Sequence, residues 1–139
     1  MNTKQKTFLV CILMLSFGLS GCAAKVKGID SPIEVGGIQL QVTSVTTQDT
    51  YDMGDQRMEP ASSADTILVV EASVSEATDD LVVSVMDENG RTDSPSVTQT
   101  KTMDDEITMT WLFGVSKSAE SFTLNLPGDI AIPLDSLLK

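Results

Sequence analysis

The chain has 139 residues, with 20 acidic and 9 basic side chains and no histidine, so its formal net charge is −11. This length supports one hydrophobic core, and two domains would be cramped. The acidic balance argues against nucleic-acid binding, which needs clustered Lys and Arg, and the lack of histidine removes the usual zinc ligand and the general base of nucleophilic triads.

The N-terminal segment has the layout of a secretory signal. Lys4 and Lys6 precede an apolar run over residues 8–19, which is shorter than the roughly 20 residues of a membrane-spanning helix. The run ends in Leu-Ser-Gly-Cys at positions 19–22, which resembles the lipobox of bacterial lipoproteins. In that motif the Cys thiol receives a diacylglyceryl group before the peptide is cleaved.

We therefore expect cleavage of residues 1–21 and lipidation of Cys22, followed by a short tether, so that residues 22–31 link the anchor to the domain. Two or more acyl chains anchor a protein stably, which predicts a location on the extracytoplasmic face of the cell membrane. Because Ala23 rather than Asp follows the Cys, the resemblance implies the outer membrane in a cell with two membranes. Cleavage removes two basic and no acidic residues, which changes the net charge from −11 to −13.

From residue 32 onward the pattern is that of a β domain. Apolar and polar residues alternate with period two, as in strands that bury one face. The alternation marks residues 38–43, 67–75, 107–115, 122–126 and 130–134, and residues 81–86 are a run of β-branched and apolar residues that also predicts a strand. Turn residues separate these segments at Gly36-Gly37, at Asn89-Gly90, which favours a hairpin with a type I′ turn, and at Pro127-Gly128-Asp129. Residues 32–139 are predicted to form an all-β, immunoglobulin-like antiparallel β-sandwich of about seven strands.

One long stretch, residues 46–64, lacks this alternation and is predicted to be a loop. Loops of this length in compact domains are uncommon and often functional. The candidate partner-binding residues within it are Asp49, Tyr51, Asp52, Asp55 and Glu59. Tyr51 either folds back on the sandwich or contacts a basic protein or a sugar. Trp111, the only Trp, is expected to be a core anchor rather than a ligand platform.

Ion binding is the main alternative to protein binding. Three polar clusters, at 79–80, 87–89 and 104–106, offer carboxylate or amide oxygens suited to calcium, but none has EF-hand spacing and each also fits a solvated turn. Thioethers suit copper, but only Met53 and Met58 share a loop, which makes copper capture a minor alternative. We assign no metal site and no cofactor.

Two segments carry a resemblance to a known family. Residues 66–74, Thr-Ile-Leu-Val-Val-Glu-Ala-Ser-Val, and residues 81–90, Leu-Val-Val-Ser-Val-Met-Asp-Glu-Asn-Gly, resemble the centre of the telokin-like, immunoglobulin-fold lipoproteins of Gram-positive bacteria, whose function is unknown. Residues 109–119 and 122–126 resemble the later strands of that family. Residues 91–94 depart from it, because the pattern has an aromatic strand residue there. The resemblance implies the fold and brings no activity.

Catalysis is not expected from this sequence. After cleavage the domain contains neither histidine nor an unmodified cysteine, and no carboxylate pair is marked as in a glycosidase. The sequence therefore predicts a membrane-anchored cell-envelope lipoprotein that is a non-catalytic protein-interaction or accessory module. Its expected partners are the membrane, through the lipid anchor, and an envelope protein, with no nucleic acid. The alternative is an envelope lipoprotein that binds calcium or another ion.

Overall fold

The computed structural model describes residues 26–139, and the expected signal peptide and Cys22 lie outside this range. All the regular secondary structure in this range is β-strand, which confirms the predicted all-β class. They are β1 (Ile33–Val35), β2 (Ile38–Gln48), β3 (Tyr51–Asp52), β4 (Arg57–Met58), β5 (Asp65–Val74), β6 (Ser84–Asp87), β7 (Thr92–Asp93), β8 (Val97–Met103), β9 (Glu106–Ser116), β10 (Phe122–Leu126) and β11 (Ile130–Pro133). This part of the chain contains no helix long and apolar enough to cross a membrane.

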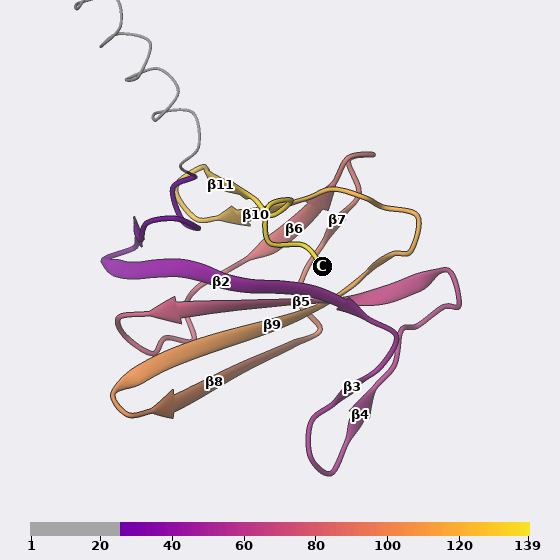
Figure 1. Cartoon of the computed structure of the whole chain (residues 1–139), viewed down its shortest axis with the longest axis horizontal. Helices are drawn as coiled ribbons and strands as arrows, with labels where there is room; N and C mark the ends of the chain where they lie inside the picture. Colours follow the sequence, from indigo (N-terminus) through magenta and orange to yellow (C-terminus); the bar gives the residue numbers. More distant parts are fainter. Residues whose placement is uncertain (1–25) are drawn as a thin grey trace, which may run out of the picture.

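Nine of the strands form two antiparallel sheets that pack as the expected sandwich. One sheet has five strands in the order β1-β2-β5-β9-β8, and the other has four in the order β11-β10-β6-β7. Figure 1 shows the smaller sheet lying across one face of the larger one. Strands β3 and β4 pair only with each other, as a small separate hairpin. We call the face of the five-stranded sheet that points away from the smaller sheet its outer face.

The core lies between the two sheets and follows from the period-two pattern. Strands β5 and β9 pair over ten residues each, from Asp65 opposite Ser116 to Val74 opposite Ile107. Alternate residues of both strands are buried against the other sheet, and Trp111 is fully buried among them, as expected of a core anchor. The buried members from the smaller sheet include Val85, Phe122, Leu124 and Ile132.

A bulge in β2 explains a break in the apolar alternation. Leu40 and Val42 are buried, but the next buried residue, Val45, is three positions further on. The pairing of β2 with β5 shifts between Val42 and Ser44, which adds one unpaired residue to β2. The extra residue changes which face the later positions point to, so Val45 also enters the core.

Two turns show what the sequence pattern predicted and what it missed. The hairpin at Asn89-Gly90 forms between β6 and β7, but only Gly90 has a positive φ, of 85°, so the turn is not the expected type I′. Oδ1 of Asp87 accepts hydrogen bonds from the backbone N–H groups of Asn89 and Arg91, which stabilise a longer turn between β6 and β7.

The acidic pair Asp104-Asp105 has φ of 51° and 65° and forms the tight turn between β8 and β9.

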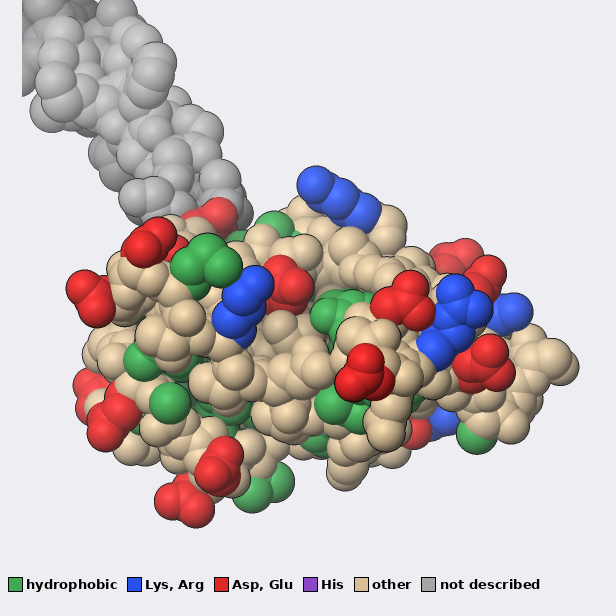
Figure 2. All heavy atoms as spheres, turned by 90° about the horizontal axis from the view of Figure 1, so that it is seen from below, with side chains coloured by type: hydrophobic (Ala, Val, Ile, Leu, Met, Phe, Trp, Pro, Cys, Tyr) green, Lys and Arg blue, Asp and Glu red, His purple; other side chains and the backbone are tan. Residues whose placement is uncertain are grey.

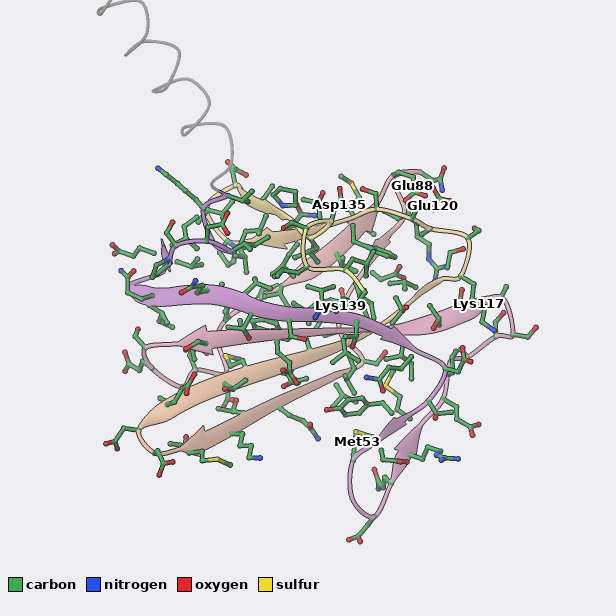
Figure 3. All side chains as sticks on the ribbon, in the orientation of Figure 1. Met53, Glu88, Lys117, Glu120, Asp135 and Lys139 are labelled. Atoms are coloured by element: carbon green, nitrogen blue, oxygen red, sulfur yellow. The ribbon has the colours of Figure 1, made fainter. Side chains whose placement is uncertain are left out.

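Both ends of the described chain pack against the sandwich. Residues 26–31 fall in the range expected for the tether, yet Ile29 is only 8% exposed and Gly28 accepts a hydrogen bond from Val42 N at 2.6 Å. At the other end, the N–H of Lys139 donates to Val45 O at 3.3 Å, so the C-terminal segment lies beside β2 (Figures 1 and 3). The ordered domain thus includes residues on the N-terminal side of residue 32.

Candidate binding site

The stretch expected to be a loop contains the β3–β4 hairpin, which is fixed to the outer face of the large sheet. Tyr51 pairs with Met58 and Asp52 with Arg57, and the turn is closed by a hydrogen bond from Met53 N to Gln56 O at 2.7 Å. Three buried residues of β5 and β9 lie beneath the hairpin, namely Ile67, Val69 and Leu112. The side chains that pack on them are Tyr51, Met53, Met58 and Val97 (Figure 3 labels Met53).

This arrangement places Tyr51 against the sandwich. Its side chain is half-buried on the sheet, so it folds back on the sandwich rather than projecting into solvent. Met53 and Met58 likewise belong to the small apolar cluster under the hairpin. All three side chains are partly buried in this cluster, and filling such a cluster is the role that thioethers most often have in proteins.

The acidic residues predicted for a binding loop are all exposed on this hairpin or beside it. Asp52 and Asp55 lie in the hairpin, Asp49 precedes it and Glu59 follows it. Asp52 accepts a hydrogen bond from Arg57 Nε at 3.0 Å, with the two side chains 73% and 59% exposed. Such an exposed ion pair contributes little to stability. The structure thus brings the predicted acidic residues together on one anchored protrusion.

A polar groove of about 510 Å³ runs along the outer face beside Tyr51. Its walls come from the hairpin, β5, β8, β9 and the β8–β9 turn. The lining residues are Tyr51, Glu71, Gln99, Lys101, Met103, Asp104, Glu106, Thr108 and Thr110. Figure 2, which looks at the molecule from below the view of Figure 1, shows hydrophobic side chains only as small separate patches among polar and acidic groups. Apart from Tyr51 and Met103, the residues that line the groove are charged or carry an amide or hydroxyl group, so the groove is suited to hydrogen bonding rather than to an apolar ligand.

A second hollow, of about 430 Å³, includes Met58 and Glu59 of the hairpin region and is lined by the charged residues Arg91, Asp65 and Asp93. Arg91 donates from Nη1 to Asp65 Oδ1 at 3.1 Å and from Nε to Asp93 Oδ2 at 3.1 Å. The hydrogen bond to Asp65 and the negative charge of Asp93 raise the pKa of Arg91 above its ordinary value. The guanidinium is thus neutralised on two sides and offers little free positive charge to a ligand.

The geometry gives no support to the calcium alternative. Within residues 26–139 no group of three or more Asp, Glu, His or Cys side chains is placed to hold a metal ion. The carboxylates of Asp87 and Glu88 accept hydrogen bonds from nearby backbone N–H groups, and Asp104-Asp105 makes a tight turn. Each of these acidic groups thus has a role in local structure.

Sequence reasoning missed the groove and the hairpin anchor. A signal for the anchor was nevertheless present, because residues 67–70 and 111–113 are apolar without interruption. A strand that is apolar on both faces is covered on both faces. The groove residues gave no such signal, because Gln99 and Lys101 lie in a segment without apolar alternation and Thr108 reads as the solvated face of a strand.

Comparison of the chain with protein-family models, curated proteins and solved structures finds no match. The fold and the site therefore rest on the residues themselves. The resemblance to the telokin-like lipoproteins stays a prediction, as do the signal peptide and the lipidation of Cys22.

Proposed function

We propose that this chain is a lipid-anchored module of the cell envelope that binds a partner protein through the β3–β4 hairpin. The acyl chains on Cys22 hold the domain at the extracytoplasmic face, and the exposed acidic residues of the hairpin contact a basic surface of the partner. The domain has no catalytic role in this proposal. Its task is to position the partner at the membrane.

One observation carries the proposal: the acidic hairpin is held in place by an apolar cluster of its own. Tyr51, Met53 and Met58 pack on the sheet, whereas Asp52, Asp55 and Glu59 are exposed. A segment that is already ordered loses less conformational entropy when it binds, and this favours affinity. Arg57 offsets the charge of Asp52, but the net charge of residues 49–59 stays negative, which speeds the approach of a positively charged partner.

Charge reversal tests this function on the full chain. The variant Asp55→Lys/Glu59→Lys changes the hairpin, and the matched control Glu76→Lys/Asp79→Lys makes the same change in net charge on exposed residues of the β5–β6 connection. Each protein is chemically cross-linked to its neighbours in isolated envelopes, and the adducts are identified by mass spectrometry. We expect the hairpin variant to lose an adduct that the wild type and the control retain.

The salt dependence of the adduct gives a second measurement. Exposed charges are screened over about 8 Å at physiological ionic strength, so a contact made by the hairpin acids weakens as salt is added. An adduct that survives hairpin reversal, or that both variants lose equally, would contradict the proposal. Circular dichroism of each variant confirms that the β-sandwich is intact.

A further inference from the structure

Strand β8 forms a long sheet edge that no other part of the described chain covers. It has seven residues, and every one except Val97, which is half-buried, is exposed. The other edges of the two large sheets in residues 26–139 are shorter: β1 has three residues, β7 has two, and β11 has four and ends at Pro133. An edge strand leaves backbone N–H and C=O groups available to another strand.

The features that normally protect such an edge are almost absent from β8. Its sequence, Val-Thr-Gln-Thr-Lys-Thr-Met, has no proline, and its pairing with β9 is regular over all seven residues. Lys101 is the only charged residue of β8, whereas the chain as a whole is strongly acidic. Threonine is common in strands. The edge is therefore neutral to slightly positive and well suited to extending the sheet.

We propose that β8 pairs with β8 of a second copy of this chain, antiparallel and centred on Thr100, to form a continuous ten-stranded sheet. In this register the opposed residues are Val97 with Met103, Thr98 with Thr102, Gln99 with Lys101, and Thr100 with itself. Antiparallel pairing places opposed side chains on the same face, so the two outer faces and their grooves lie on the same side of the dimer. The inference is independent of the proposed function of the hairpin.

Charge and the number of paired residues select this register over its neighbours. Centring the pair on Lys101 would place that residue opposite itself, and like charges directly opposed are destabilising. Centring it on Gln99 would pair only five residues of each strand instead of seven. The register centred on Thr100 uses the whole strand, roughly 23 Å long, and places Lys101 opposite the neutral amide of Gln99. A second copy thus fits the edge without a charge conflict between opposed residues.

Substitutions at Gln99 test the register through the sign of their effect. Gln99→Glu places two new opposite-charge pairs in the dimer, and we expect dimerisation of the full chain to tighten roughly 3- to 10-fold. Gln99→Lys places positive charges directly opposite each other and should weaken dimerisation by a similar factor. The double variant Gln99→Lys/Lys101→Glu pairs opposite charges again and should restore dimerisation. Sedimentation of the full chain in mild detergent over a range of concentrations gives the dimer constant.

If general repulsion between acidic molecules controlled dimerisation, the effects would be reversed. Gln99→Glu would weaken the dimer because it adds negative charge, and Gln99→Lys would strengthen it because it reduces the net negative charge. That pattern would overturn the proposal, and so would a chain that stays monomeric at all concentrations and in all variants.

A second measurement uses Thr100→Cys in a background with Cys11 and Cys22 replaced by Ser. A short thiol cross-linker joins two such chains, whereas the control Thr43→Cys, exposed on β2, gives no dimer. Equal cross-linking at both positions would exclude the β8 edge.

Discussion

Arg91 joins the two sheets through Asp65. The arginine precedes β7 of the four-stranded sheet and donates from Nη1 to the carboxylate at the start of β5, at 3.1 Å. The Asp65 side chain is only 18% exposed, so this pair is better shielded from solvent than the Arg57–Asp52 pair of the hairpin. Arg91 also donates from Nη2 to Gly114 O at 3.4 Å, which adds a contact to β9.

We predict a measurable coupling between Arg91 and Asp65 and almost none between Arg57 and Asp52. In each case the test is a double-mutant cycle with Ala, measured by urea unfolding. The coupling of the inter-sheet pair should decrease in 1 M salt, because salt screens partly exposed charges. Both pairs have the same residue types, so the hairpin pair is the matched control. Equal coupling in the two cycles would show that solvent exposure does not distinguish them.

The second prediction concerns Trp111, which is fully buried and whose indole Nε1–H has no hydrogen-bond partner. Trp111→Ala leaves a large cavity and should lower the free energy of unfolding by about 3–5 kcal/mol. Trp111→Phe leaves a smaller cavity and removes the unpaired N–H, so its cost should be clearly lower. Denaturant unfolding followed by circular dichroism measures both. If Phe were as damaging as Ala, cavity size would not be the main cause.

The third prediction concerns stability in acid. Glu88 accepts hydrogen bonds from the backbone N–H of Glu120 at 2.9 Å and of Ser121 at 3.2 Å, which links the β6–β7 turn to the loop before β10 (Figure 3). The contact with Glu120 makes the largest contribution to lowering the pKa of Glu88, followed by its own backbone N–H. A carboxyl with a lowered folded-state pKa adds stability that is fully present above its ordinary value of 4.5 and is lost as the pH falls through the folded value.

Glu88→Gln should therefore reduce Tm at neutral pH and make the decrease in Tm below about pH 4.5 less steep. Thermal unfolding at several pH values between 7 and 3 measures both effects. The control is Glu76→Gln, which removes an exposed carboxylate from the β5–β6 connection. Parallel Tm curves for wild type and Glu88→Gln would show that this carboxylate does not contribute to the acid response.

The fold class followed from the sequence because the central strands bury one face. In residues 107–115 the apolar side chains at alternate positions enter the core, so the pattern carries the structure directly. Strand β8 was not predicted because its sequence has no apolar face. All its side chains except Val97 are exposed, and its backbone pairing with β9 holds it in place. Hydrophobic periodicity cannot detect a strand of this kind.

The candidate site was predicted in composition but not in form. The acidic residues of the long stretch were identified, and the structure places them in one hairpin or directly beside it. Strands β3 and β4 have two residues each, too few for any periodic pattern. The hairpin depends on contacts between residues distant in sequence, such as Tyr51 with the cluster that contains Leu112. Contacts of this kind become visible only when the strands are in place.

The anchoring of the hairpin leads to the last prediction. Tyr51→Ala removes the largest hairpin side chain that packs on Ile67, Val69 and Leu112. Because Tyr51 is half-buried, the change should reduce the free energy of local hairpin opening by about 1–2 kcal/mol, which leaves the core between the sheets intact. Amide hydrogen exchange should therefore speed up in residues 51–58 and stay unchanged in β9 and β10. The matched control Tyr51→Phe keeps the ring and should preserve protection. Faster exchange throughout the sandwich would mean that the hairpin and the domain unfold together.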